Sequence, residues 1–239
     1  MIHRFATAEN PVLPMSRARV FFDGLFSEPR LQHPEGLAIG PDGWIWCGGE
    51  NGEVLRIDPT GTRIERVAQG GGFTLGLAFL RDEALFFCDL RDKAVYRLDL
   101  ATRRTQRFTP PGIRIPNYPA IDAARGRLLV SDSHDFATPG PGVWAYDLAT
   151  GEGRLWYDRP LVFANGLALE PSGAALYVCE TFARRITRVA IAADGSAGEA
   201  TPFATDLLGL PDGIAFDERG DLFCGCYEPS RILRIKRGG

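Results

Sequence analysis

Asn165-Gly166-Leu167-Ala168 is the clearest copy of a sequence motif that occurs five times in the chain. Each copy opens with an anchor residue, which is followed by a short apolar run, a Gly-containing turn and further short runs. The five anchor residues are Glu35, Leu75, Asn117, Asn165 and Asp212. All but Leu75 carry a side-chain oxygen, so the same point of successive repeats offers oxygen donors. That pattern indicates a functional site built from several repeats.

The first copy shows what one repeat contains. Short runs rich in aliphatic, β-branched and aromatic residues at 36–39, 44–47, 54–57 and 64–68 are separated by Asp-Gly, Asn-Gly and Asp-Pro-Thr-Gly turns. Asn-Gly and Asp-Gly between such runs favour hairpins, because the turn requires positive φ. The repeat is therefore predicted to be a four-stranded antiparallel meander.

The period of the repeat predicts the architecture. The residues that follow the anchors fall at positions 36, 76, 118, 166 and 213. Four strands in every 40 to 50 residues are typical of a β-propeller blade, and no stretch has a convincing helical period. We expect an all-β propeller over residues 19–239, preceded by an N-terminal arm over 1–18. Since the first strand of each blade lines the central channel, the anchors are expected to converge on the axis.

The sequence is compatible with two ways of closing the ring of blades. The fifth copy ends after its third strand, whereas a predicted strand at Arg19–Phe22 precedes the first copy without partners. This N-terminal strand could complete the fifth blade of a closed five-bladed ring. Alternatively, a sixth blade is missing from the sequence.

Composition narrows the classes of function. The 239 residues are 45% hydrophobic and 24% charged, with a formal net charge of −3, which gives no electrostatic reason to expect nucleic acid or an anionic membrane as a partner. The first 19 residues contain Pro11 and Pro14 and no continuous apolar core, so we expect no signal peptide and a cytoplasmic location. Four of the five cysteines, Cys47, Cys88, Cys179 and Cys224, are assigned to one repeated position, where a small buried slot is expected.

The oxygen donors suit one kind of chemistry. Carboxylates and amides form a hard site that favours calcium, magnesium or manganese over zinc in a thiolate cage. Asp212 is the candidate general base, with Asn117 orienting a water or substrate oxygen. The chain contains no Gly-x-Ser-x-Gly elbow for a serine nucleophile. Taken singly, Asn165-Gly166 and Asp212-Gly213 are equally compatible with ordinary turns that precede strands.

Three further residues are candidates for contacting a substrate. His33 precedes Glu35 by two positions, His134 lies in a Pro- and Gly-rich loop between Asp132 and Asp135, and Glu180 follows a cysteine at a strand end. Each has a structural alternative: a surface or core histidine for His33, stabilisation of a turn for His134, and a side chain turned away from the channel for Glu180.

Several stretches in a fixed order resemble the regucalcin (SMP-30)/gluconolactonase family. They are Glu35-Gly36, 164–168 (Ala-Asn-Gly-Leu-Ala), 176–186 (Leu-Tyr-Val-Cys-Glu-Thr-Phe-Ala-Arg-Arg-Ile) and 210–215 (Leu-Pro-Asp-Gly-Ile-Ala). The resemblance covers about residues 19–239 and implies a six-bladed propeller. It also implies a divalent cation on the axis, often calcium, held by Glu35, Asn165 and Asp212. In the same way it assigns Asn117 to substrate or water and Asp212 to the role of general base in lactone hydrolysis.

One departure from the family pattern affects the substrate. Sugar-lactone members commonly carry Arg two residues before the anchor of the third blade, where this chain has Ile115, and Arg114 is one position further away. We therefore expect a hydrolase of small lactones that uses one divalent cation, calcium first, with manganese, magnesium or zinc as alternatives. The other interpretations are a non-catalytic propeller that binds calcium or a small ligand, and an esterase for non-sugar substrates. The oligomeric state is left open.

Overall fold

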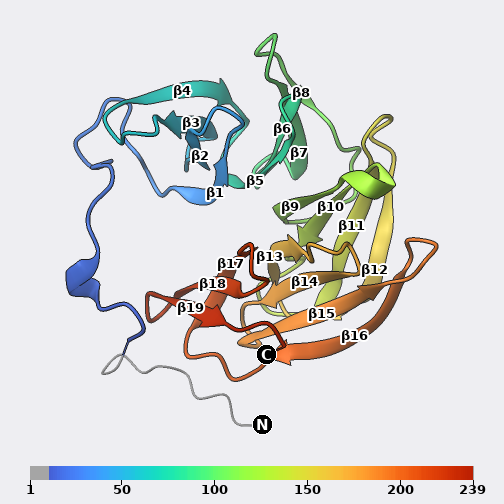
Figure 1. Cartoon of the computed structure of the whole chain (residues 1–239). Helices are drawn as coiled ribbons and strands as arrows, with labels where there is room; N and C mark the ends of the chain where they lie inside the picture. Colours follow the sequence, from blue (N-terminus) through green and yellow to red (C-terminus); the bar gives the residue numbers. More distant parts are fainter. Residues whose placement is uncertain (1–10, 239) are drawn as a thin grey trace.

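Five antiparallel sheets are arranged as the blades of a propeller in the computed structural model, which describes residues 11–238 (Figure 1). Blades 1 to 4 have four strands each, and blade 5 has three. The strands are β1 (Glu35–Ile39), β2 (Ile45–Gly48), β3 (Glu53–Ile57), β4 (Ile64–Gln69), β5 (Thr74–Leu80), β6 (Ala84–Asp89), β7 (Ala94–Asp99), β8 (Thr105–Arg107), β9 (Pro116–Asp122), β10 (Arg127–Asp132), β11 (Gly140–Asp147), β12 (Gly153–Leu161), β13 (Ala164–Leu169), β14 (Ala175–Glu180), β15 (Arg185–Ile191), β16 (Ala197–Ala204), β17 (Leu210–Phe216), β18 (Leu222–Tyr227) and β19 (Arg231–Ile235). The predicted all-β propeller is confirmed.

Helical structure is confined to two 3₁₀ turns within the described range, at Met15–Arg17 and Ala123–Arg125. No helix in this range is long and apolar enough to cross a membrane.

The hydrophobic core lies between the blades. One cluster fills each junction, and a typical example joins Tyr177 and Cys179 of blade 4 to Ile214 and Cys224 of blade 5. The junctions between blades 1 and 2, 2 and 3, and 3 and 4 have corresponding clusters of their own. Consequently each blade is stabilised by burying apolar side chains against its neighbours.

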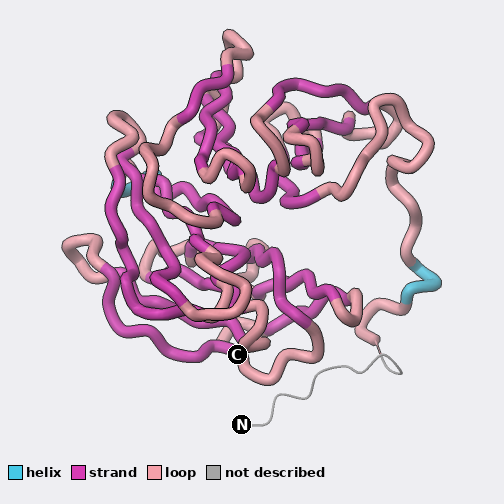
Figure 2. Tube along the Cα trace, turned by 180° about the vertical axis from the view of Figure 1, so that it is seen from behind, coloured by secondary structure: helices cyan, strands magenta, loops and turns pink. Residues whose placement is uncertain are grey.

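The segment before β1 differs from the prediction. Arg19–Phe22 forms no strand, and blade 5 has no fourth strand from the described residues, so closure by an N-terminal strand is wrong. Phe22 and Leu31 instead pack against the apolar residues of blade 1, and the Leu31 amide donates to the Gly24 carbonyl at 2.9 Å. The segment reaches blade 1 alongside the opening between blades 1 and 5 (Figures 1 and 2). The six-bladed count stays a prediction.

The cysteines are free and buried, as expected of small packing residues, but they do not share one position. Leu37 pairs with Cys47, and the equivalent Leu77 pairs with Phe87, so Cys88 lies one residue further along its strand. In blade 5, Ile214 pairs with Cys224, but in blade 4 the equivalent Leu167 pairs with Val178, so Cys179 also lies one residue further along its strand. Neighbouring residues of a strand face opposite sides of the sheet, and therefore the predicted single slot is wrong.

Candidate metal centre at the blade axis

A β-bulge interrupts the pairing of the first strand of every blade at its anchor. The register shifts between Glu35 and Leu37 in blade 1, and at the corresponding points of blades 2 to 5. A bulge inserts an extra residue, bends the strand and re-aims a side chain. The repeated motif around each anchor residue therefore corresponds to a β-bulge that recurs in every blade.

The bulges of neighbouring blades are packed against one another. A Cβ atom added at Gly36 would lie 2.7 Å from the Leu75 carbonyl oxygen, and one added at Gly166 would overlap the carbonyl oxygen of Asp212. The glycine that follows an anchor thus allows the backbones of two blades to meet. Because the inner strands contact one another in the order β1, β5, β9, β13 and β17, the anchors form an arc around the axis (Figure 1).

Glu35 and Asp212 come from blades 1 and 5, far apart in the sequence, and still interact. Burial raises the pKa of Glu35 to about 7, and the negative charge of Asp212 adds to this effect. Burial also raises the pKa of Asp212, although a hydrogen bond from Asn165 and the charge of His33 act in the opposite direction. Two carboxylates that are desolvated together favour protonation or a bound cation.

Asn165 supplies the most specific feature of the site. Its side chain is buried, with 5% of its surface exposed, and its Nδ2 donates to Thr181 Oγ1 at 3.2 Å. Its carbonyl oxygen Oδ1 has no hydrogen-bond partner among residues 11–238. Buried polar atoms are nearly always paired, so an unpaired amide oxygen on a side chain that contacts the Asp212 carboxylate is a candidate cation ligand.

These donors fit a divalent cation. Glu35 and Asp212 can supply two negative charges, and Asn165 a neutral oxygen, which matches the all-oxygen preference of calcium or magnesium. Within residues 11–238, no three His, Cys, Asp or Glu side chains are grouped so that they could hold a metal ion. The candidate set contains only two such side chains, and its third member is an amide.

The other predicted residues lie at different distances from this centre. His33 is mostly exposed, and its Nε2 lies 3.4 Å from Glu35 Oε1, which puts its ring at the mouth of the site. Asn117 is half-buried at its bulge and donates from Nδ2 to Ser133 Oγ at 3.0 Å. His134 lies on the rim of blade 3, where its Nε2 is 3.1 Å from Arg114 NH1. The Arg114 guanidinium is thus directed toward this rim loop.

Glu180 is fully buried and engaged in structural contacts. Its carboxylate accepts hydrogen bonds from Arg185 at 2.6 and 2.8 Å, from the Thr187 hydroxyl, and from the Val162 amide at 2.9 Å. Asp132 has a similar role, since it accepts the backbone amides of Arg114 and Ile115. These acids hold the segment that leads into the anchor of their own blade.

Sequence reasoning missed two groups near the centre. Tyr227 ends β18, and the pKa of its phenol is raised by burial and then by the negative charges of Asp212, Glu228 and Glu35. Ser133 and Thr181 hold the anchor amides, and each follows an acidic residue at the end of a second strand. The paired acid-hydroxyl sequences Asp132-Ser133 and Glu180-Thr181 were the available signal.

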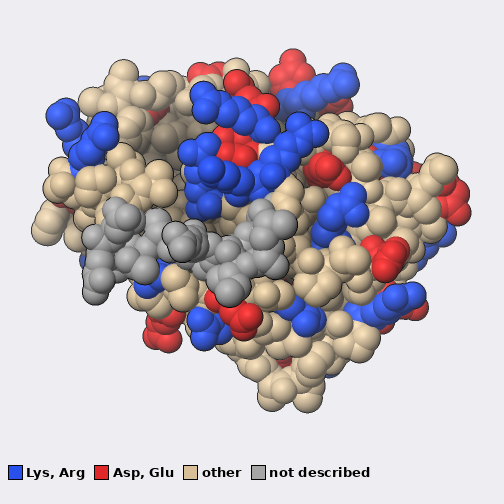
Figure 3. All heavy atoms as spheres, turned by 60° about the horizontal axis from the view of Figure 1, so that its bottom comes forward, with Lys and Arg blue, Asp and Glu red and all other residues tan. Residues whose placement is uncertain are grey.

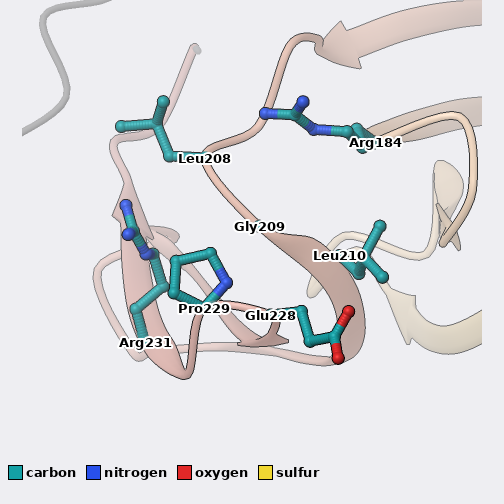
Figure 4. A pocket seen from close by; sticks show the side chains of 7 residues that line it. All are labelled: Arg184, Leu208, Gly209, Leu210, Glu228, Pro229 and Arg231. Atoms are coloured by element: carbon teal, nitrogen blue, oxygen red, sulfur yellow. The ribbon is translucent and has the colours of Figure 1, made fainter.

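A pocket of about 450 Å³ adjoins the anchor end of blade 5. Leu210, which begins β17 two positions before Asp212, lines it together with Glu228. Arg184 and Arg231 lie on opposite sides of the pocket (Figure 4). Elsewhere the surface carries basic and acidic side chains close together, as one face of the molecule shows (Figure 3).

Fold and repeat define a β-propeller of four-stranded blades, and two family models match parts of the chain. Residues 123–239 match the family model described as SMP-30/Gluconolactonase/LRE-like region, and residues 25–57 match that of the strictosidine synthase-like N-terminal region. The resemblance to the SMP-30/gluconolactonase family expected from the sequence is thereby confirmed.

Solved structures share the fold. A calcium-binding protein, regucalcin, from Agrobacterium tumefaciens superposes with a TM-score of 0.72 at 20% identity, over 87% of this chain and 72% of its own. A gluconolactonase from Xanthomonas campestris gives 0.69 at 23% identity, over 86% and 76%. The chain therefore shares the propeller fold of these two proteins.

The curated relatives are longer than this chain. The adipocyte plasma membrane-associated protein Hemomucin of Drosophila melanogaster is 27% identical over 81% of this chain and 38% of its own length. The strictosidine synthase-like 6 protein of Arabidopsis thaliana is 28% identical over 80% and 55%. The chain spans about two fifths to about half of the length of these relatives.

Proposed function

We propose that the chain is a divalent-metal-dependent hydrolase of small lactones. The observation that carries the proposal is the meeting of Glu35, Asn165 and Asp212, with the buried Asn165 Oδ1 left without a partner. These three side chains would hold the cation, with calcium preferred and manganese, magnesium or zinc as alternatives. When bound, it would polarise the lactone carbonyl and lower the pKa of a water molecule.

Each of the chain's own residues has a proposed role in this reaction. Asp212 accepts a proton from the attacking water, whose oxygen bonds to the acyl carbon. The ring C–O bond then breaks, the ring oxygen takes up a proton, and the product is a hydroxy acid. Asn117 orients the water or the lactone oxygen, and His33 contacts the substrate at the mouth. His134 and the basic pocket beside β17 are candidates for contacts with groups further from the reacting bond.

The test is a pH-indicator assay over a panel of sugar and non-sugar lactones and aryl esters. We expect turnover of at least one lactone, its loss after EDTA treatment, and its recovery when calcium or manganese is added. Asp212→Ala is expected to lower kcat/KM by about 10² to 10⁴, the usual contribution of a general base. Activity that survives both EDTA and this substitution would refute the proposal. Ion binding without turnover on any member of the panel would instead identify a non-catalytic binding propeller.

A further inference from the structure

Two buried hydroxyls occupy equivalent places in blades 3 and 4. Ser133 follows β10, Thr181 follows β14, and each stands 16 residues after the anchor of its own blade. Both side chains are at most 1% exposed. Because both residues are buried, the hydrogen bonds of these hydroxyls connect one part of the protein to another.

Each hydroxyl links its anchor to the next blade. Asn165 Nδ2 donates to Thr181 Oγ1 at 3.2 Å, and Thr181 Oγ1 donates to the Pro211 carbonyl at 2.8 Å. Asn117 Nδ2 donates to Ser133 Oγ at 3.0 Å, and Ser133 Oγ donates to the Ala164 carbonyl at 2.7 Å. Pro211 and Ala164 immediately precede the anchors Asp212 and Asn165. A relay of amide, hydroxyl and carbonyl therefore connects the anchors of blades 3, 4 and 5.

The relay fixes the orientation of the Asn165 amide, whose Nδ2 is held by Thr181 Oγ1. The two ends of an amide group differ, since NH₂ only donates hydrogen bonds and the oxygen only accepts them. With Nδ2 held by Thr181 Oγ1, the unpaired Oδ1 is the end left for a ligand. If the amide turned over, its NH₂ group would face that ligand position, and a cation there would be repelled.

We propose that Thr181 is the positioning residue of the metal centre, with Ser133 as its counterpart one blade earlier. Thr181 fixes the orientation of Asn165 and holds the carbonyl next to Asp212, so that one hydroxyl aligns two of the three ion-binding side chains. Ser133 holds the carbonyl that precedes Asn165 and orients Asn117. This inference rests on the proposed function, because it presumes a cation at the centre.

The test compares Thr181→Val with Thr181→Ser in metal-stripped protein titrated with Ca²⁺ by calorimetry. Val keeps the volume of Thr and removes the relay, whereas Ser keeps the hydroxyl. We expect Ca²⁺ affinity to fall about 10- to 100-fold in Thr181→Val, as when an outer partner of a metal ligand is lost, and to change less than about threefold in Thr181→Ser. Equal affinity of Thr181→Val and wild type would overturn the inference.

A second variant covers the case in which Thr181→Val does not fold, as judged by circular dichroism. Ser133→Ala leaves the Ala164 carbonyl and the Asn117 amide without their partner, so we expect Ca²⁺ affinity to fall by about threefold or more and kcat/KM for a lactone to fall further. Unchanged affinity in this variant would overturn the inference. Failure of the wild-type protein to bind Ca²⁺ or Mn²⁺ would instead refute the proposed function.

Discussion

At the scale of single residues, the ionisation of Glu35 and Asp212 is the property of the site that is most easily measured. Both side chains are half-buried. Burial and the negative charge of Asp212 raise the pKa of Glu35 to about 7, and burial raises the pKa of Asp212 above its ordinary value. Without a cation, the folded protein therefore holds protons that the unfolded chain has already lost.

This difference predicts how the stability of the metal-free protein depends on pH. Below about pH 4.5, the ordinary pKa of Glu, the group is protonated in both states and carries no penalty. As pH rises toward 7 the unfolded chain loses this proton and folded Glu35 retains it, so the free energy of unfolding falls and then levels off. We expect a decrease of about 1 kcal/mol or more, which corresponds to roughly 2–4 °C in Tm.

Glu35→Gln is the control for that measurement. A neutral amide does not titrate, and the variant should lose most of the decrease in Tm between pH 4.5 and 7 in EDTA, with the contribution of Asp212 remaining. A Tm profile identical to that of wild type would contradict the assignment of the raised pKa to Glu35.

Anchors could be predicted from the sequence, whereas the groups around them could not. Glu35, Asn165 and Asp212 are marked by the repeat itself. Thr181 and Ser133 were not predicted, because the carbonyl groups to which they donate lie in the next blade, and such contacts depend on the packing of sheets. Glu180 was a candidate for the channel because strand period alone does not tell which partners a side chain meets. Its pairing with Arg185 became visible only in the folded blade.

At the scale of elements, the bulge at the start of each inner strand determines where an anchor points. The residue after the anchor must leave room for the backbone of the next blade, as Gly166 does for Asp212. Gly213 is the matched exception, since a Cβ atom at that position would meet nothing within 4 Å. The two glycines have the same place in the repeat and opposite surroundings.

Alanine substitutions of these two glycines should consequently differ. Gly166→Ala forces a side chain against the backbone of blade 5, and we expect a loss of about 1–3 kcal/mol in the free energy of unfolding, together with weaker ion binding. Gly213→Ala should change stability by no more than about 0.5 kcal/mol. Urea unfolding of both variants measures this difference, and equal stability would argue against the packing of neighbouring bulges.

The strands themselves were predictable because hairpin turns and alternating apolar residues are local signals. The segment before β1 was predicted wrongly for the same reason: Arg19–Phe22 has the composition of a strand, but no sheet edge receives it. The apolar side chain of Phe22 is partly buried against blade 1 instead.

At the scale of the whole molecule, the arc of blades has two ends with exposed apolar faces. Leu37 in β1 is 65% exposed, while Leu77 at the same place in β5 is 2% exposed and packs against blade 1. In blade 5 the side chains that face away from blade 4 are likewise exposed, as Ile232 shows at 76%. Each interior blade thus buries both faces against other blades, whereas the outer face of blade 1 is covered only in part, by Phe22 and Leu31 of the segment before β1.

Leucine-to-alanine substitutions measure this difference in burial between blades 1 and 2. Leu77→Ala should lower the free energy of unfolding by about 2–5 kcal/mol, because it leaves a cavity between two blades. Leu37→Ala removes a side chain that contributes little buried area, and should cost less than about 1 kcal/mol. If both variants unfolded at the same urea concentration, the face of blade 1 would have to be covered in solution.

The most direct test of the central claim is a calorimetric titration of EDTA-stripped protein with Ca²⁺. We expect one ion per chain, and a loss of about 100-fold in affinity in Asp212→Ala, since a contact with a charged group is worth roughly 1.5–3 kcal/mol. Gly213→Ala, next to Asp212 in open space, should bind as wild type does. Absence of binding by the wild-type chain, or the same affinity in Asp212→Ala, would contradict a metal centre at the blade axis.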